Sequence, residues 1–281
     1  MIFHLQICRL QTNKAKRQFF CLILKHDKKI VPFLNNSCYN HTVMSDIIST
    51  TISQGANELN IELPPGTEAA FKAYYDFLEN RGQNVNLTAI SGAEEVARLH
   101  FLDSLVLLKT TDFYNKSVID IGSGAGFPGV PLKLAEPSIK ITLLDSTGKR
   151  ISFLSELCRE LGIDASYINA RAEEVAHEYN NREQYDIAVS RAVARLNVLC
   201  ELCLPFVCVG GLFIAMKSVD SDEEIAEAQN AIETLGAKLI EKHDYKIPGT
   251  DVIHRAVLIR KTHMTPERYP RRFAKIQKTP L

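Results

Sequence analysis

Two stretches in the first half of the chain show the hydrophobic period of an amphipathic helix. Between residues 64 and 82, apolar or aromatic side chains recur three or four positions apart, at Ala70, Phe71, Tyr74, Tyr75 and Leu78. Between residues 91 and 109, the run SGAEEVARLHFLDSLVLLK opens with Ser91 and Glu94, which have the spacing of a capping box. The pattern therefore predicts two helices before residue 110.

From residue 118 onward, short apolar runs alternate with helical patterns. Five runs have the composition of strands buried on both faces, at residues 118–121, 139–145, 165–170, 185–190 and 210–217. Strands separated by helices call for a parallel, doubly wound sheet. Two final runs, 237–247 and 254–262, alternate apolar and polar positions around a Pro-Gly turn. The expected fold is α/β, a Rossmann-like, mostly parallel sheet of seven strands with an antiparallel edge hairpin and N-terminal helices.

Composition is compatible with this architecture. The chain has 281 residues, 46% hydrophobic and 23% charged, as expected for one α/β domain with additions or two small domains. Seven scattered cysteines in a chain without a clear secretory signal indicate free thiols and a cytoplasmic location. Cys200 and Cys203 lie in an apolar helical run and are interpreted as core residues. The apolar stretch 202–216 is too short to span a membrane.

The formal net charge is zero, but the charges are unevenly distributed. Residues 1–43 hold seven Lys or Arg and one acid, so the rest of the chain holds 26 basic and 32 acidic side chains. Beyond Thr262, the only acid is Glu267, against five basic residues, Arg268, Arg271, Arg272, Lys275 and Lys278. This tail fits either a polyanionic partner or a solvated, disordered end, and charge alone does not distinguish the two.

The first 43 residues have neither an apolar signal-peptide core nor an amphipathic pattern, whereas Met44 opens a plausible protein start, MSDIISTTI. We expect them to be a misassigned upstream extension or a disordered leader. The expected organisation is this extension, an N-terminal helical region, a Rossmann-like core and a basic tail, at residues 1–43, 44–108, 109–262 and 263–281.

The strand-to-helix junction VIDIGSGAGFPG, residues 118–129, is the candidate ligand site. Gly122 and Gly124 allow a sharp bend and a close approach of a ligand to the backbone, and Pro128 suits the first turn of a helix. A buried strand, a glycine turn and a helix N-terminus together form a nucleotide-binding edge. The dinucleotide pattern requires glycine where this chain has Phe127, whereas G-x-G-x-G is the form seen in S-adenosylmethionine enzymes.

Polar side chains follow the other expected strands, at the edge where open α/β sheets bind ligands. Asp145 ends the second strand, where a carboxylate accepts hydrogen bonds from ribose hydroxyls. After the third strand, the backbone N–H at Ala172 and the Glu173 carboxylate suit an adenine edge, and after the fourth, Arg191 suits a ligand carboxylate or an RNA phosphate. A helix cap or a strand-end salt bridge is the alternative for each. Asp120 has the further alternative of holding the turn.

A polar face is expected on the second predicted helix. His100, Asp103 and Ser104 lie three and four positions apart there, so they share one side of it. This face either makes local hydrogen bonds on the helix surface or lies beside a ligand pocket.

Several separated blocks of the chain resemble one family, the bacterial 16S ribosomal RNA guanine-N7 methyltransferases G. The blocks are NVNLTAI (84–90), HFLDSL (100–105), VIDIGSGAGFPGVPL (118–132), LLDSTGKRISFL (143–154), SRAVA (190–194) and TPERYPRR (265–272). The resemblance implies a class I S-adenosylmethionine-dependent methyltransferase that modifies guanine 527 of 16S rRNA. The cofactor contacts that it implies are Gly122, Gly124, Phe127, Asp145, Ala172, Glu173 and Arg191. The family pattern has a basic residue directly before His100, whereas this chain has Leu99 there and Arg98 one position earlier.

The implied reaction needs no general acid or base, because guanine N7 has an in-plane lone pair and no proton. We therefore assign no catalytic residue and expect catalysis by positioning. The expected partner is 16S rRNA or the small ribosomal subunit, bound by a monomer without a metal or a membrane. The candidate RNA contacts are His100, Lys217, Arg268, Arg271, Arg272 and Lys275. Tyr269 and Phe273, among the tail arginines, suit either stacking on bases or packing on their own domain.

Two other classes of function remain open from the sequence. An NAD-dependent oxidoreductase is disfavoured by Phe127 and by the lack of a recognisable hydride-transfer dyad. A catalytically silent RNA-binding or ribosome assembly factor with the same fold is the other alternative, because a fold alone does not determine an activity.

Overall fold

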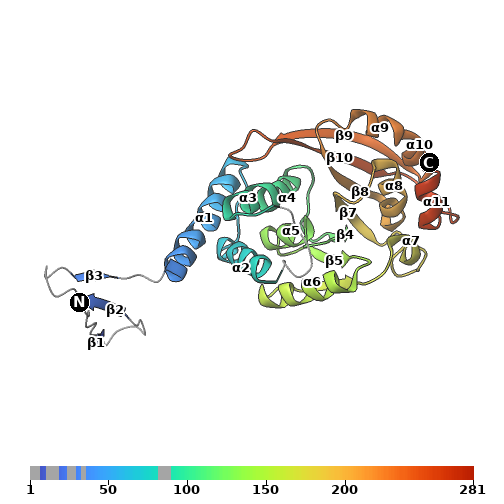
Figure 1. Ribbon diagram of the computed structural model, residues 1–281. Helices are drawn as coiled ribbons and strands as arrows, with labels where there is room; N and C mark the ends of the chain where they lie inside the picture. Colours follow the sequence, from blue (N-terminus) through green and yellow to red (C-terminus); the bar gives the residue numbers. More distant parts are fainter. Residues whose placement is uncertain (1–6, 11–18, 24–29, 33–35, 82–89) are drawn as a thin grey trace. The chain divides into compact units, whose positions relative to one another are not determined.

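The computed structural model describes residues 7–10, 19–23, 30–32, 36–81 and 90–281, and the chain divides into two compact units, residues 1–47 and 48–281. In the first unit, an antiparallel sheet has the strand order β1 (Ile7–Leu10), β2 (Phe19–Ile23) and β3 (Ile30–Pro32) (Figure 1). Helix α1 (Asn36–Glu58) begins in the first unit and ends in the second. The expected extension at residues 1–43 stays a prediction, and residues 84–89 of the block NVNLTAI lie outside the described residues.

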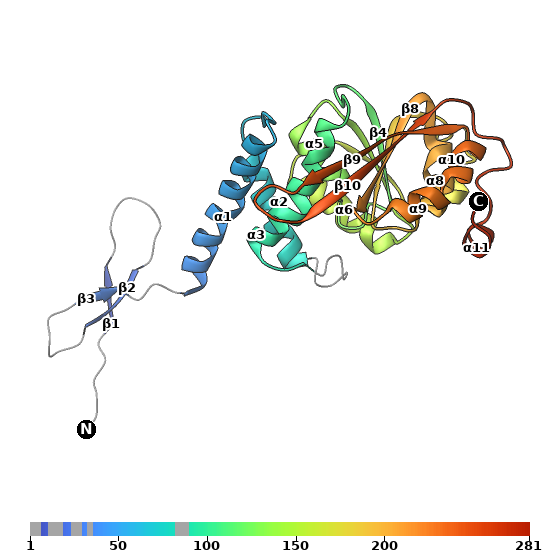
Figure 2. The same cartoon turned by 90° about the horizontal axis from the view of Figure 1, so that it is seen from above.

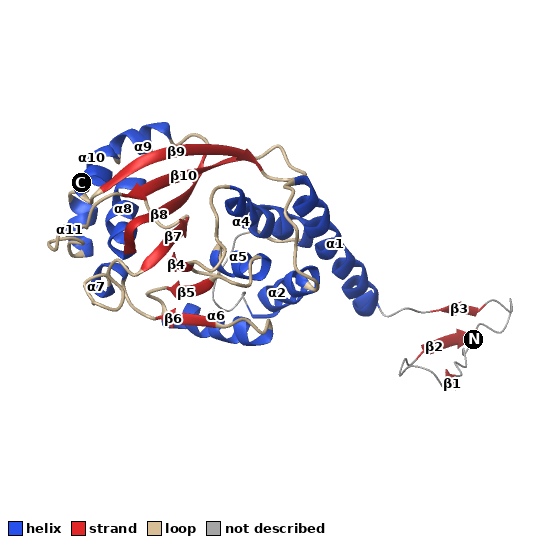
Figure 3. Ribbon diagram, turned by 180° about the vertical axis from the view of Figure 1, so that it is seen from behind, coloured by secondary structure: helices blue, strands red, loops and turns tan. Residues whose placement is uncertain are grey.

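In the second unit, the described residues form a sheet of seven strands in the order β6-β5-β4-β7-β8-β10-β9 (Figure 3). The strands are β4 (Ser117–Ile121), β5 (Lys140–Leu144), β6 (Ala165–Ile168), β7 (Tyr185–Arg191), β8 (Val207–Ser218), β9 (Ala237–Lys246) and β10 (Ile253–Lys261). The first five run parallel, whereas β10 is antiparallel to both β8 and β9. The predicted mostly parallel sheet with an antiparallel edge pair is therefore confirmed.

Helices precede and connect these strands. Before β4 lie α2 (Thr67–Arg81), α3 (Ala93–Val96), a π-helix (Ala97–Leu102), α4 (Asp103–Leu105) and a 3-10 helix (Val106–Lys109). After β4 follow α5 (Gly129–Ala135), α6 (Gly148–Glu160), α7 (Ala172–Val175), α8 (Leu196–Cys203), a 3-10 turn (Leu204–Phe206), α9 (Asp222–Glu227), α10 (Gln229–Thr234) and α11 (Phe273–Lys278). The predicted N-terminal helices are confirmed, but the second is a series of short helices with different hydrogen-bonding patterns.

Side chains of the central strands alternate between two hydrophobic cores, one on each face of the sheet. Along β4, Val118 belongs to the core that includes α2, α5 and α6, and Ile119 to the core that includes α8 and α10. Figures 1 and 2 show these two groups of helices on opposite sides of the strands. Helices on both faces explain why the strands are continuous apolar runs in the sequence.

The predicted capping box at the start of the second helix is wrong. Helix α3 begins at Ala93 with Gly92 as its N-cap, and no side chain caps it. Glu94 instead accepts a hydrogen bond from Arg98 (Nε–Oε1, 3.0 Å). Arg98 also donates to the carbonyl of Pro248 in the β9–β10 turn (2.9 Å). Arg98, which lies one position before the basic residue of the family pattern, thus joins the helix to the turn between the edge strands β9 and β10.

Candidate functional site

The glycine turn between β4 and α5 has backbone torsion angles that residues with a side chain adopt only at an energetic cost. Gly122 has φ +75° and Gly124 has φ +57°, and left-handed φ values favour glycine because a Cβ atom crowds the backbone there. The amide N–H groups of Gly122 and Ser123 both donate to the carbonyl of Leu144 at the end of β5 (2.8 and 3.0 Å). The turn is therefore fastened to the neighbouring strand, with its backbone facing the edge of the sheet.

The Asp120 side chain joins the two ends of this turn. Its side chain is fully buried, and Oδ2 accepts a hydrogen bond from the backbone N–H of Gly129, the first residue of α5 (2.9 Å). Oδ1 has no hydrogen-bond partner in the described part of the chain. Burial raises the pKa of Asp120 to about 7, although the Gly129 bond opposes this. Of the two alternatives for Asp120, the contacts favour the structural one.

One cavity of about 790 Å³ opens beyond the carboxyl ends of the parallel strands. Its lining includes every residue expected to contact the cofactor, namely Gly122, Gly124, Phe127, Asp145, Ala172, Glu173 and Arg191. The volume lies within the range of small-molecule and cofactor sites. Residues up to 69 positions apart in the chain thus meet in one place, because the carboxyl ends of parallel strands share an edge.

Asp145 is oriented by the loops around it. Oδ1 accepts from the backbone N–H of Thr147 (2.8 Å), and Oδ2 accepts from the N–H of Gly124 (3.1 Å) and from Arg150 (3.3 Å). A carboxylate oxygen has two lone pairs, so Oδ1 keeps one acceptor position for a further donor. Glu173 is also buried, and it lines the cavity from the first turn of α7.

Arg191 lies at the end of β7 against the ring of Phe127, with Cζ 4.9 Å from the ring centroid. Its Nη1 donates to Asp103 Oδ2 (3.1 Å) and to the carbonyl of Leu99 (3.2 Å), and Nη2 contacts His100 Nδ1 (3.0 Å). The guanidinium is thus held by the π-helix and α4 on one side and by an aromatic ring on the other. An arginine in this setting is pre-oriented for a planar anionic partner.

The expected polar face of His100, Asp103 and Ser104 separates into two roles. His100 and Asp103 line the cavity, whereas Ser104 is buried and donates to the carbonyl of His100 within the helix (2.6 Å). Burial, followed by the nearby Arg191 charge, lowers the pKa of His100 to about 4. His100 is therefore neutral at pH 7 and offers RNA no positive charge.

Two residues of the cavity region were missed by the sequence analysis. Tyr245 on β9 donates its hydroxyl to Asp103 Oδ1 (2.9 Å), and His254 on β10 contacts the same oxygen through Nδ1 (2.9 Å). Their strands were interpreted only as the edge of the sheet. A histidine near the start of β10, before the apolar run AVLI, was the available signal.

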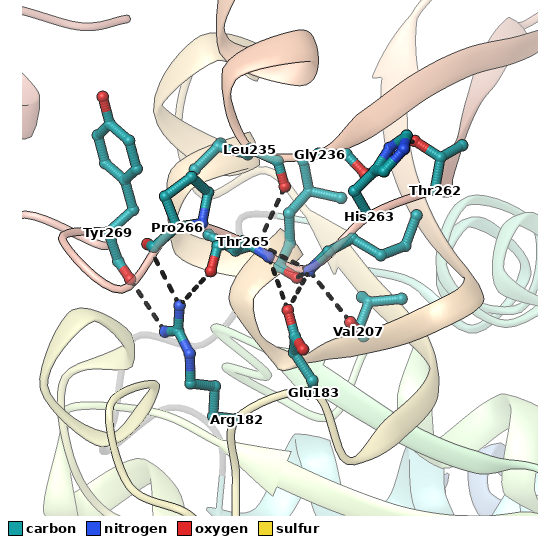
Figure 4. Close-up of polar contacts among 12 residues, drawn as sticks. Arg182, Glu183, Val207, Leu235, Gly236, Thr262, His263, Thr265, Pro266 and Tyr269 are labelled. Atoms are coloured by element: carbon teal, nitrogen blue, oxygen red, sulfur yellow. Dashed lines mark hydrogen bonds and ion pairs between the residues drawn. The ribbon is translucent and has the colours of Figure 1, made fainter.

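The basic tail is packed onto its own domain (Figure 4). Arg182 donates to the carbonyls of Thr265 (2.8 Å) and Tyr269 (2.9 Å). Lys261, 0% exposed, donates to the Thr265 hydroxyl (2.7 Å) and pairs with Glu183 (3.1 Å). The segment between β10 and α11 is therefore anchored to the domain, and its Tyr269 is buried.

The tail cations have different surroundings. Arg271 forms a two-pronged ion pair with Glu201, which is 0% exposed on α8 (Nη2–Oε2 2.6 Å, Nε–Oε1 2.8 Å). This pair gives Arg271 a structural role. Arg268, Arg272 and Lys275 are exposed, as an RNA contact requires.

Lys217 lies at the wall of the cavity, at the end of β8. Its ammonium donates to the carbonyl of Ala194 (2.7 Å) and pairs with Glu224 (2.6 Å). Elsewhere in the described residues, no three His, Cys, Asp or Glu side chains are grouped as a metal site requires. No helix of this part of the chain has the length and apolar character of a membrane span.

Comparison with known proteins gives a consistent result. A family model described as rRNA small subunit methyltransferase G matches residues 67–249. The Ribosomal RNA small subunit methyltransferase G of Alkaliphilus metalliredigens is 44% identical over 232 residues, covering 82% of this chain and 97% of that protein. The protein of the same name from Lachnoclostridium phytofermentans is 45% identical over 235 residues, with 83% and 97% covered. A solved structure, M. jannaschii TYW2 in complex with AdoMet, is 15% identical with a TM-score of 0.46, covering 63% of this chain and 80% of that one.

Proposed function

The chain belongs to the rRNA small subunit methyltransferase G family, S-adenosylmethionine-dependent enzymes that act on small-subunit ribosomal RNA, and we propose that it methylates N7 of a guanine in 16S rRNA. We propose guanine 527 as the position, and we propose that the protein acts as a monomer on RNA within the small ribosomal subunit.

The observation that carries this proposal is that all seven expected cofactor residues line one cavity beyond the glycine turn. Asp145 would accept a hydrogen bond from a ribose hydroxyl through the free position on Oδ1. The Ala172 backbone and the Glu173 carboxylate would contact the adenine, with the backbone of Gly122 and Gly124 beneath the ligand. These donors and acceptors fit a nucleoside that carries a methionine group.

Charge around the cavity suits a cationic methyl donor. S-adenosylmethionine, when bound, supplies a methyl carbon on a positively charged sulfur. Asp145 and Glu173 are acidic and buried, and the positive charge of Arg191 is offset by Asp103 at 3.1 Å. We propose that Arg191 pairs with the methionine carboxylate while Asp103 limits its repulsion of the sulfonium.

The chain needs only to hold and align the base. Guanine N7 attacks with its own lone pair, so no residue has to remove a proton. The rings of Phe127 and His100, which line the cavity, are stacked with centroids 4.5 Å apart, and the buried ring of Tyr74 stacks on Phe127 at 5.4 Å. A closely packed lining of this kind supports catalysis by positioning, in which the reacting atoms are held in line.

For contact with RNA outside the cavity, we propose the exposed cations Arg268, Arg272 and Lys275. Phosphate contacts by such side chains supply most of the non-specific affinity for nucleic acid. Arg271 and Lys217, which are ion-paired, and His100, which is neutral, would contribute less.

The experiment is a methyl-transfer assay. Small ribosomal subunits from a strain that lacks this gene are incubated with the purified chain and S-adenosylmethionine, and the 16S rRNA is mapped by mass spectrometry. We expect one added methyl at guanine N7. Thermal stabilisation by S-adenosylhomocysteine and not by NAD excludes the oxidoreductase. Subunits that stay unmethylated would instead support the silent assembly factor.

A further inference from the structure

A polar network crosses the cavity wall on the side of β10. Its centre is the Asp103 carboxylate, 1% exposed. Oδ2 accepts from Arg191 (3.1 Å), and Oδ1 meets the Tyr245 hydroxyl and His254 Nδ1, both at 2.9 Å. Residues from β7, β9, β10 and α4 therefore form one network. A contact local to the helix would involve only neighbouring residues of that helix.

The network determines which nitrogen of His254 carries the hydrogen. A carboxylate oxygen only accepts hydrogen bonds, so Nδ1 of His254 must donate. Burial raises the pKa of Tyr245 far above its usual range, so its hydroxyl also stays a donor. In the neutral imidazole, Nε2 is then left with a lone pair. Nε2 has no hydrogen-bond partner among the residues that the structure describes.

His254 lies in the part of the cavity where we expect the target guanine to bind. Its side chain is 33% exposed and lines the cavity, and it pairs in register with Ser218 at the carboxyl end of β8. Six of the seven residues proposed to hold the methyl donor follow β4, β5 and β6, and the seventh, Arg191, ends β7, whereas β10 is separated from β7 by β8. The cavity thus has a second half, bounded by β8 and β10.

We propose that His254 binds the pyrimidine edge of the target guanine, accepting a hydrogen bond from a base N–H at Nε2, and that Asp103 is the positioning residue for this contact. The inference rests on the proposed function, because it names the side chain that reads the base. Guanine has N–H donors at N1 and at its 2-amino group. Adenine has an acceptor at N1, where guanine has an N–H, so an Nε2 acceptor placed opposite position 1 favours guanine over adenine.

The contact would strengthen during the reaction. The lone pair of N7 forms a bond to the methyl carbon, the bond from that carbon to the donor's sulfur breaks, and its electron pair stays on sulfur. The positive charge passes to the base and makes its N–H groups stronger donors. Because Nε2 lies in a ring held by a carboxylate, it meets this charge without rearranging. The expected effect is therefore on kcat more than on binding.

The test compares His254→Ala and His254→Gln with the wild-type chain on unmethylated small ribosomal subunits. The matched control is His263→Ala, because His263 is an exposed histidine after the far end of β10. We expect kcat of His254→Ala to fall about 10- to 100-fold, with the Kd for S-adenosylhomocysteine unchanged. Glutamine should recover part of the rate, since its amide oxygen also accepts a hydrogen bond. In the His254→Ala background, Asp103→Asn should lower kcat by less than it does alone.

Each failure has a distinct signature. If His254→Ala keeps the wild-type kcat, or loses cofactor affinity in proportion to rate, the assignment of His254 is overturned. Full additivity of the two substitutions would remove Asp103 as its positioning residue. If the wild-type chain binds S-adenosylhomocysteine but methylates no guanine N7, the proposed function itself fails.

Discussion

At the residue scale, the glycine turn shows how a single atom limits the site. A Cβ at Gly122 would lie 2.5 Å from Cγ2 of Val193, a cavity-lining residue. Gly162, after α6, has a similar left-handed φ of +66° but nothing within 4 Å of its Cβ position. The two glycines share the backbone strain of a substitution and differ in their surroundings.

We therefore expect Gly122→Ala and Gly162→Ala to lose similar stability, about 1 kcal/mol each, from left-handed strain. Only Gly122→Ala should weaken binding of S-adenosylhomocysteine, by about tenfold, because the added methyl displaces Val193 into the cavity. Thermal denaturation and calorimetric titration measure the two quantities. Equal cofactor affinities for the two variants would contradict this role of the turn.

A second residue-scale prediction concerns Asp120, whose pKa burial raises to about 7. The folded chain then binds this proton more tightly than the unfolded chain does, so the free energy of unfolding falls as pH rises from about 4 to 7. The slope approaches about 1.4 kcal/mol per pH unit. Asp120→Asn keeps an acceptor for the Gly129 N–H and should remove this contribution. Denaturant titrations of both proteins across that range measure it, and parallel pH dependences would refute it.

At the scale of elements, the tail behaves as part of the domain. Its loop is held by Arg182 and Lys261, and Ile276 of α11 is buried. Deletion of residues 266–281 would leave Glu201 buried without its partner. Such a deletion would report on stability as well as on RNA binding, so point substitutions are the better probe.

The Arg271–Glu201 pair and the neighbouring Arg272 provide that probe. Arg271→Ala leaves a buried carboxylate unpaired and should destabilise the domain by about 3 kcal/mol. Arg272 is exposed, so Arg272→Ala should change stability by less than about 0.5 kcal/mol. Chemical denaturation gives both values. Similar stabilities for the two variants would show that the tail is not anchored through Glu201.

At the scale of the whole molecule, an acidic body has to meet a polyanion. The exposed cations Lys275 and Lys278 belong to α11, whose first residue, Phe273, lines the cavity. One short helix thus carries both exposed positive charge and a residue of the proposed site. Local patches of this kind, and not net charge, decide where nucleic acid binds.

Lys275→Ala should weaken binding to small ribosomal subunits and reduce the slope of log affinity against log salt by about 1, as expected for one lost phosphate contact. Lys140→Ala is the control, because Lys140 is also exposed but lies at the amino end of β5, whereas the cavity lies beyond the carboxyl ends of the parallel strands. Cofactor affinity should stay the same in both. A salt slope that is identical for the two variants would place RNA elsewhere.

The sequence by itself determined the order of strands and helices, the edge pair and the glycine turn. These features follow from local periodicity and from the backbone demands of single residues. The sequence also predicted that Gly122, Asp145, Glu173 and Arg191 lie close together, since parallel strands end at a common edge. All four line one cavity. The predicted capping box at Ser91 was wrong because the N-cap of the helix is Gly92, one residue later than the sequence pattern placed it.

Only the tertiary structure decided which partners these residues have. Asp103 meets His254 across 151 positions of the chain, and Arg271 meets Glu201 across 70. Such pairs depend on how strands and helices pack, and no local pattern encodes them. The same packing makes His100 neutral and the tail an ordered part of the domain, because burial changes the chemistry of a side chain that the sequence shows only by type.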